Sequence, residues 1–410
     1  MKFSHIADCH IGSYRDERMR DLTIEAFRSA VNISIDENVD FVLISGDLFN
    51  TSIPSIDSLK ATTSELKRLL DRNIPVYVIA GSHDFSPSGK TMLDVLDNAG
   101  LCKNVVKGSV NEEGLLSLNV TTDLKTNIKI TGMIGKRGTL EKSYYKSLDT
   151  SSLEKLEGFK IFMFHSAITE LKPKGLDNME SAPMSFLPKG FNYYAGGHVH
   201  SVMKVSSKEL GGVIAYPGPL FPNSFSELEA LNHGGFYIFD SSIPELLKFV
   251  PVEIKKVFPI KLDATNLSPD IVTNKILELA KDEVRDKIVL LRIKGKLVSG
   301  RPSDIDMKSI FEAFYDSGAY FVMKNTSSLV SDEFEEISVD SSSIHDIEEK
   351  VVKENVGQFK FSKLDFDSDM EHKKSLEMLE ILDVEKQDGE NQKEFEERII
   401  DNLGLFKEDS

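Results

Sequence analysis

Three predicted strands near the N-terminus, two of which begin as nearly continuous apolar runs, constrain the fold of this 410-residue chain more than any other feature. They cover residues 2–8, 39–47 and 74–84, and the two segments between them, 17–38 and 55–73, have apolar residues at helical spacing. Apolar strands that alternate with helices usually pair in parallel and are buried on both faces of their sheet. The pattern therefore predicts an α/β domain, in which ligands bind where the strands end.

The remaining sequence predicts three further parts. Between about 104 and 240 the apolar runs come closer together, which predicts a second sheet facing the first. A strand–helix–strand pattern then predicts a small α+β domain, and leucines at helical spacing near the end predict two short amphipathic helices broken near Gly389. We therefore divide the chain into a first domain over 1–250, a small α+β domain over 251–330, an acidic linker over 331–370 and terminal helices over 371–410.

Charge and composition leave a nucleic-acid partner open. The formal net charge is −17, but residues 331–410 hold 25 acidic and 10 basic side chains, so the rest of the chain is nearly neutral. No apolar run approaches the ~20 residues of a membrane span, and the N-terminus shows no export signal. The two cysteines, Cys9 and Cys102, cannot build a disulfide framework. We expect a cytoplasmic protein, associated with the nucleoid if the source is prokaryotic, and no membrane partner.

Five short fragments place potential metal ligands at the ends of predicted strands, and they contain five of the nine histidines. The fragments are ADCH with Asp8 and His10, SGDLF with Asp47, GSHD with Ser82, His83 and Asp84, FHS with His165, and GGHVH with His198 and His200. Carboxylates and imidazoles without thiolate suit Mn, Fe, Zn or Co. One such fragment is more often structural, but five at strand ends predict a metal centre.

The same residues predict hydrolysis of a phosphate ester. Asp47 has two carboxylate oxygens and follows a glycine, so it is placed to bridge two ions. Two bridged ions bind a phosphate and lower the pKa of a water between them. His83 would then act as the acid that protonates the departing oxygen or steadies its charge. This chemistry alone does not identify the substrate.

The order Asp-x-His, Gly-Asp, Gly-Ser-His-Asp, His and Gly-His-x-His resembles that of the calcineurin-like metallophosphoesterases. Their fold is a two-sheet sandwich flanked by helices. Within that superfamily, the stretches FSHIADCHIGSYR, VLISGDLFNTSIPS and IPVYVIAGSHDFSPSG are similar to those of DNA double-strand-break repair nucleases of the meiotic recombination eleven and SbcD type. The resemblance covers residues 1–240 well, the small domain by position and pattern, and the tail only by general character.

The resemblance implies two Mn²⁺ ions per subunit, with other divalent transition metals also possible. The implied ligands are Asp8, His10, Asp47 and His200 for one ion, and Asp47, Ser82, His165 and His198 for the other, with His83 as the catalytic histidine. Asp84 would orient His83 or its neighbours. The superfamily usually has asparagine in place of Ser82. Because a neutral hydroxyl is a weaker ligand than an amide carbonyl, we expect a lower affinity for the second ion.

The implied activity is a nuclease that degrades duplex DNA ends as a 3′→5′ exonuclease and cuts single strands as an endonuclease. The implied partner is an SMC-like coiled-coil ATPase bound by the terminal helices, and the implied homodimer forms through helices 55–73 and 88–99. Folding of the terminal helices onto their own chain and packing of the other two within one chain are the alternatives. The small domain resembles a DNA-capping domain.

Several residues are candidate DNA contacts. They are Tyr14, Arg15, Arg18 and Lys90 near the rim of the site, and Lys294 and Lys296 in the small domain. Ordinary solvated loop charge, or lysines that protect a strand edge, explain them equally well.

Two other functions stay open. One is a calcineurin-like phosphodiesterase that acts on nucleotides or cyclic phosphodiesters, which would not need the acidic linker and the terminal helices. The other is a mainly architectural DNA-end-binding subunit in which Ser82 has weakened catalysis. A Ser82→Asn variant that gains activity would support this last hypothesis.

Overall fold

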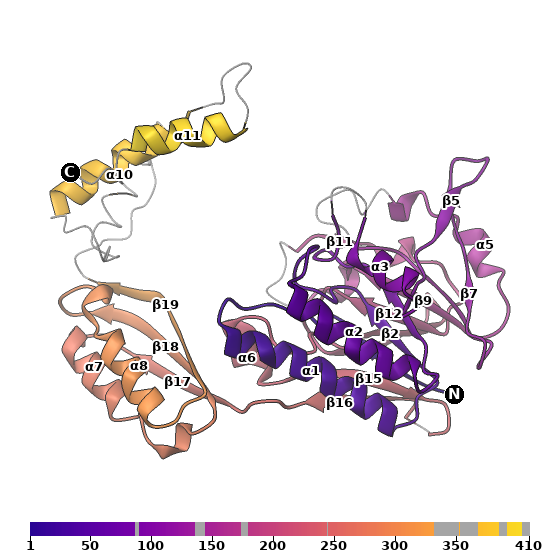
Figure 1. Ribbon diagram of the computed structural model, residues 1–410, viewed down its shortest axis with the longest axis horizontal. Coiled ribbons are helices and arrows are strands. Elements are labelled where there is room, and N and C mark those ends of the chain that lie inside the picture. Colours follow the sequence, from indigo (N-terminus) through magenta and orange to yellow (C-terminus); the bar gives the residue numbers. More distant parts are fainter. Residues whose placement is uncertain are drawn as a thin grey trace. The chain divides into compact units, whose positions relative to one another are not determined.

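The computed structural model describes residues 1–86, 90–135, 144–173, 179–243, 245–331, 352, 368–384 and 392–403. The chain separates into two compact units, Met1–Val257 and Phe258–Ser410 (Figure 1). Most of the expected acidic linker lies outside the described residues. Across the described part of the chain, every helix is too short or too polar to span a bilayer.

The first sheet of the first unit has six strands in the order β16-β15-β1-β2-β3-β4. Its parallel strands are β1 (Lys2–Ile6), β2 (Phe41–Ser45), β3 (Val76–Ile79) and β4 (Lys103–Asn104). Two antiparallel strands, β15 (Gly234–Asp240) and β16 (Leu247–Val252), extend it beyond β1. The helices α1 (Glu17–Asp36) and α2 (Ile56–Leu70) connect the first three strands. The predicted parallel α/β pattern is confirmed.

The second sheet also has six strands, in the order β13-β14-β12-β9-β8-β7. These are β7 (Thr121–Thr122), β8 (Lys129–Gly132), β9 (Lys160–His165), β12 (Tyr193–Gly197), β13 (Met203–Ser207) and β14 (Gly212–Tyr216). The inner four strands, β8, β9, β12 and β14, run parallel to one another. The second sheet is therefore also built so that several strands end at one edge.

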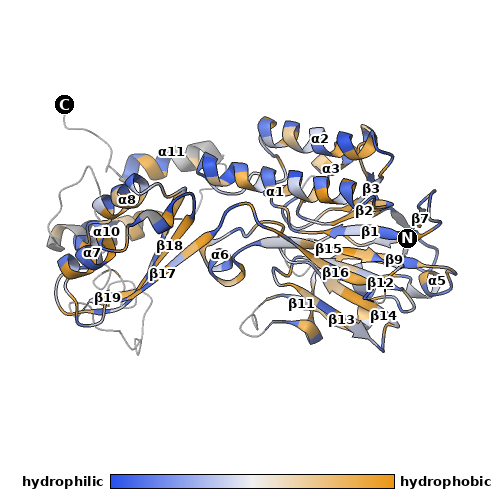
Figure 2. Ribbon diagram, turned by 90° about the horizontal axis from the view of Figure 1, so that it is seen from below, coloured by the Kyte–Doolittle hydropathy of each residue, from blue (hydrophilic) through white to orange (hydrophobic). Residues whose placement is uncertain are grey.

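Aromatic and aliphatic side chains from both sheets form one core between them. Phe3 of β1 stacks on Phe41 at 5.0 Å and on Phe239 at 4.7 Å between ring centroids, and Tyr193 of the second sheet meets it edge-on at 5.2 Å. In Figure 2, α1 and α2 carry both polar and apolar residues. The expected two-sheet sandwich flanked by helices is confirmed.

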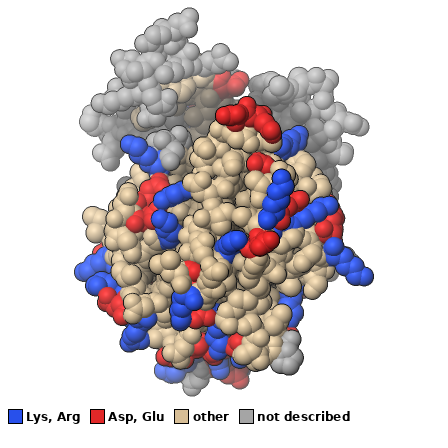
Figure 3. All heavy atoms as spheres, turned by 90° about the vertical axis from the view of Figure 1, so that its right-hand side faces the viewer, with Lys and Arg blue, Asp and Glu red and all other residues tan. Residues whose placement is uncertain are grey.

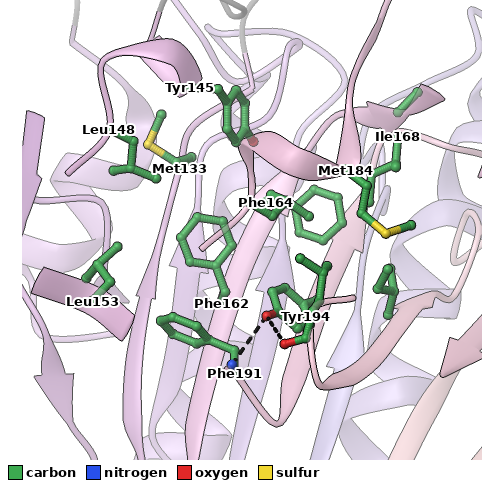
Figure 4. Close-up of a cluster of buried hydrophobic side chains, with 14 of the residues drawn as sticks. Met133, Tyr145, Leu148, Leu153, Phe162, Phe164, Ile168, Met184, Phe191 and Tyr194 are labelled. Carbon is green, nitrogen blue, oxygen red and sulfur yellow. Dashed lines mark hydrogen bonds between the residues drawn. The ribbon is translucent and has the colours of Figure 1, made fainter. Parts of the chain in front are cut away.

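The outer face of the second sheet has its own core, which is drawn in Figure 4. Phe162 and Phe164 of β9 pack there with Phe191 and Tyr194, and the Tyr194 hydroxyl accepts a hydrogen bond from the Phe191 amide at 3.3 Å. Because β9 and β12 are buried along their whole length, these two strands are fixed in position up to their ends.

Shorter elements complete the first unit. They are α3 (Met92–Asn98), β5 (Gly108–Val110), β6 (Leu116–Leu118), α5 (Thr150–Glu154), β10 (Ala167–Ile168), β11 (Ser181–Ala182), α6 (Phe225–Leu231) and the 3-10 helices Thr169–Leu171 and Met184–Phe186. The expected helix over 88–99 begins later, at Met92, because Thr91 and Asp94 form a capping box there.

The second unit contains a three-stranded sheet in the order β17-β18-β19. The strands are β17 (Val257–Asp263), β18 (Ile288–Leu297) and β19 (Phe321–Ser331), and the helices are α7 (Pro269–Leu277), α8 (Met307–Asp316), α10 (Ser368–Leu382) and α11 (Gln392–Leu403), with 3-10 helices at Asp282–Val284 and Pro302–Asp304. Apolar residues of α7 and α8 share one core with the sheet, and α10 packs against α11.

Candidate metal centre

The strand ends of the two facing sheets bring the ligand-bearing turns together. Asp8 and His10 follow β1, Asp47 follows β2, Ser82 and His83 follow β3, His165 ends β9, and His198 and His200 follow β12. The site contains three groups of residues, and within each group the potential ligand atoms lie within 4.8 Å of one another. The groups are Asp8 with His10 and His200, His10 with Asp47 and His83, and Asp8 with Asp47 and His165. Residues from both sheets thus converge on one site.

The backbone of this site is strained at four of the ligand candidates. The φ angles are 50° at Asp8, 43° at His10, 51° at Asp47 and 82° at His198. A residue other than glycine in this region costs of order 1–3 kcal/mol and persists only where its surroundings demand it. Such outliers concentrate at functional sites, and four of them together indicate that this is a functional site.

Asp47 lies between the two groups of ligand candidates. Its Oδ2 is 3.7 Å from His10 Nε2 and 3.2 Å from His165 Nε2. Its Oδ1 accepts a hydrogen bond of 2.7 Å from the His83 amide, and Ser82 Oγ lies 3.4 Å from Oδ2. The carboxylate is 2% exposed, so it has almost no contact with solvent. This position fits a carboxylate shared by two cations.

His165 carries the observation that tests whether a cation fits. Its Nδ1 lies 2.9 Å from the Ser45 carbonyl oxygen, so that nitrogen donates to the backbone. Its Nε2 is buried and makes no hydrogen bond to any described residue, because its approach to Asp47 lacks hydrogen-bond geometry. A buried nitrogen without a partner is costly, and a cation beside the Asp47 carboxylate would satisfy it.

Burial lowers the pKa of His10 and His198 to about 4, whereas carboxylates raise the pKa of the two other imidazoles of the ligand sets. Burial lowers the pKa of His165 but the Asp47 carboxylate raises it more, to about 10. Burial likewise opposes a charge on His200, and hydrogen bonds with Asp8 and Glu227 raise its pKa to about 10. Burial raises the pKa of Asp47, but the interactions with His165, His10 and the His83 amide together lower it more. Buried carboxylates and imidazoles of this kind are suitable ligands for a divalent cation, which takes the place of the bound protons.

His83 is held by its backbone and by one ring nitrogen. Its Nδ1 lies 2.8 Å from the carbonyl oxygen of Asn50, and its ring meets that of His10 edge-on at 4.8 Å between centroids. The side chain is half-buried, so a substrate can reach it.

Asp84 joins two ligand-bearing turns. Its carboxylate accepts hydrogen bonds from the amides of Gly81 at 3.0 Å, Leu48 at 3.2 Å and Phe49 at 3.0 Å. It therefore orients the neighbours of His83 and Asp47 through their backbone. Burial and the Asp47 charge raise its pKa to about 7.

Glu227 is a contact of the site that sequence reasoning missed. Its Oε1 accepts a hydrogen bond of 2.9 Å from His200 Nδ1. The Ser-x-x-Glu pattern over 224–227 signals only the start of a helix, because the approach to His200 arises from the tertiary structure. The carbonyl groups of Ser45 and Asn50 were missed for the same reason.

The candidate DNA contacts are spread over both units. The Tyr14 hydroxyl donates to the Pro222 carbonyl at 2.7 Å, and Arg18 lies 3.3 Å from Asp16. Arg15 and Lys90 are exposed in the first unit, whereas Lys294 and Lys296 are exposed on β18 of the second. On the face shown in Figure 3, basic and acidic side chains are interspersed.

Comparisons with known proteins agree with this geometry. The family model of calcineurin-like phosphoesterases matches residues 1–202. Three relatives are each named DNA double-strand break repair protein Mre11. The Thermoplasma acidophilum protein is 30% identical over 319 residues, covering 75% of this chain and 78% of that protein. The Methanococcus maripaludis protein is 27% identical over 368 residues, covering 86% of this chain and 91% of that protein. The Archaeoglobus fulgidus protein is 27% identical over 315 residues, covering 72% of this chain and 68% of that protein.

The family expected from the motifs is confirmed: the chain belongs to the Mre11 family of calcineurin-like metallophosphoesterases.

Proposed function

We propose that the protein is a DNA double-strand break repair nuclease that hydrolyses DNA phosphodiesters with two Mn²⁺ ions. The observation that carries the proposal is the position of Asp47, whose Oδ2 approaches His10 on one side and His165 on the other. The names of the relatives support DNA as the substrate.

The ligand candidates divide into two sets around Asp47. The first cation would be held by Asp8, His10, Asp47 and His200, and the second by Asp47, Ser82, His165 and His198. When bound, such a pair of cations neutralises charge on the phosphate and lowers the pKa of a bound water.

The residues of the chain position the reacting groups. The Asn50 carbonyl accepts from His83 Nδ1, which leaves Nε2 of His83 for the substrate. A ligand atom of His83 lies within 4.8 Å of those of His10 and Asp47, so a phosphate at the site is close to it. In its doubly protonated form, with Nδ1–H held by Asn50, His83 would donate the Nε2 proton to the departing oxygen or steady its charge. Asp84 accepts hydrogen bonds from the amides of Leu48 and Gly81 and so holds the turns after β2 and β3 together.

We further propose 3′→5′ exonuclease activity on duplex ends and endonuclease activity on single strands. The second unit acts as a DNA-capping domain, and α10 and α11 bind an SMC-like ATPase. A homodimer forms through α2 and α3. Exposed apolar side chains on these helices support it, since Ile56 is 83%, Leu70 45% and Val95 56% exposed.

A linear duplex labelled at the 3′ or the 5′ end, incubated with and without Mn²⁺, tests the activity. Asp47→Asn removes the shared carboxylate, and Asp40→Asn is the matched control. Asp40 precedes β2 at its opposite end and pairs with Lys125 at 2.7 Å. We expect Mn²⁺-dependent degradation that the Asp47 variant loses and the Asp40 variant keeps.

The other outcomes separate the alternatives. Hydrolysis of a bis-aryl phosphodiester without degradation of DNA would contradict the substrate and favour a nucleotide or cyclic phosphodiesterase. Inactivity on both substrates, with retained binding of duplex ends, would favour the architectural subunit.

A further inference from the structure

The segment from Leu220 to Glu227, which runs from the loop after β14 into the first turn of α6, contacts two ligand candidates that lie far apart in the sequence. The Leu220 amide donates to the carbonyl oxygen of Asp8 at 3.2 Å. Glu227, in the first turn of α6, accepts a hydrogen bond from His200 Nδ1 at 2.9 Å. Asp8 and His200 both belong to the set of ligands assigned to the first cation, so one short segment contacts two members of that set.

Both carboxylate oxygens of Glu227 are engaged. While Oε1 accepts from His200, Oε2 accepts from the Asn223 amide at 2.7 Å. The neighbouring Pro222 carbonyl accepts from the Tyr14 hydroxyl at 2.7 Å, which anchors this segment to the loop after β1. The Glu227 side chain is 24% exposed, so the hydrogen bond to His200 is shielded from most solvent.

The hydrogen bond determines which nitrogen of His200 is available. Because Nδ1–H donates to Glu227, the lone pair of the neutral ring is on Nε2. That nitrogen lies 3.2 Å from His10 Nε2 and 3.6 Å from Asp8 Oδ1. Two imidazole nitrogens and a carboxylate oxygen thus converge where the first cation is assigned.

We propose that Glu227 is a positioning residue for the first cation. It fixes the tautomer and the ring orientation of His200, and the Leu220–Glu227 segment ties that ring to Asp8. The inference rests on the proposed function, because it requires a cation at this site. A glutamate that only capped α6 would accept from the amide of Ser224, the N-cap residue. Glu227 accepts from Asn223 and His200 instead.

Glu227→Gln is the decisive variant. A glutamine has one acceptor oxygen and one NH2 donor group in place of two acceptor oxygens, so in the same position it cannot accept from His200 at one atom and from Asn223 at the other. The matched control is Ser224→Ala, which removes the N-cap hydroxyl that accepts from the Glu227 amide at 3.2 Å and leaves the carboxylate in place. Binding of Mn²⁺ to the full-length protein is measured by the electron paramagnetic resonance of free Mn²⁺, and thermal unfolding is measured without metal.

We expect Glu227→Gln to weaken the tighter Mn²⁺ site by about 10- to 100-fold, as for other groups that orient a ligand. Ser224→Ala should lower Tm by a few degrees, roughly the effect of a lost N-cap, and change the affinity less than about threefold. Unchanged affinity in Glu227→Gln would overturn the inference alone. Equal loss of affinity in both variants would also overturn it, because support of α6 would then explain the effect. No Mn²⁺ binding by the unsubstituted protein would overturn the proposed function as well.

Discussion

Replacing Gly46 by alanine tests how closely the turn after β2 must approach His165. Gly46 has a φ of +88°, and a Cβ added to it would lie 2.2 Å from His165 Nδ1 and 2.7 Å from its Cγ. Real Cβ atoms essentially never come closer than 3.0 Å to another heavy atom. The imidazole therefore has to move by roughly 1 Å in a densely packed interior.

The expected cost has two parts. An alanine in the left-handed region costs about 1–2 kcal/mol, and overpacking a filled site costs about 1–3 kcal/mol more. The free energy of unfolding should fall by about 2–5 kcal/mol, which lowers Tm by roughly 4–20 °C for a domain of this size. Displacement of the ring should also weaken Mn²⁺ binding at the set that contains His165.

Gly100→Ala is the matched control. Gly100 also has a positive φ, +71°, but a Cβ there would meet nothing within 4 Å. This variant should therefore show the backbone cost alone and bind Mn²⁺ like the unsubstituted protein. Urea unfolding without metal and Mn²⁺ titration are measured on both variants. If Gly46→Ala is no less stable than Gly100→Ala and binds Mn²⁺ normally, the close approach to His165 does not constrain the turn.

Two further predictions concern Ser82 and His5. Ser82→Asn supplies an amide carbonyl in place of a neutral hydroxyl, so it should raise the Mn²⁺ affinity of the weaker site by roughly tenfold. A Mn²⁺ titration in which the affinity of that site is unchanged would contradict this prediction. Burial lowers the pKa of His5 to about 3, and His5 Nδ1 lies 2.9 Å from the Tyr193 hydroxyl. In the unfolded chain His5 gains a proton as the pH falls below about 6.5, whereas in the folded chain it stays neutral down to about pH 3. Lower pH therefore favours the unfolded chain, and His5 reduces the free energy of unfolding by up to about 1.4 kcal/mol per pH unit between these values. In urea unfolding between pH 6.5 and 4.5, His5→Asn should show a smaller loss of stability, and an unchanged loss would show that another group titrates.

The sequence by itself determined the sheet architecture and the set of side chains brought to its edge. The stretches over 39–44 and 74–80 are apolar at almost every position and alternate with helices, which predicts strands buried on both faces and paired in parallel, with 2–8 as a third strand. Parallel strands end at the same edge, and therefore Asp8, Asp47 and His83 had to lie close together.

Only the tertiary structure decided how these side chains are held. The sequence suggested that Asp84 orients His83 or its neighbours, and the structure shows it bound to the amides of Gly81, Leu48 and Phe49. The Ser45 carbonyl that fixes His165 is 120 residues away from it. Glu227 has the sequence context of a helix cap, yet it contacts His200. Every residue carries an amide and a carbonyl, so sequence alone does not reveal which of them a side chain will meet. That choice depends on where turns from two packed sheets come within hydrogen-bonding distance.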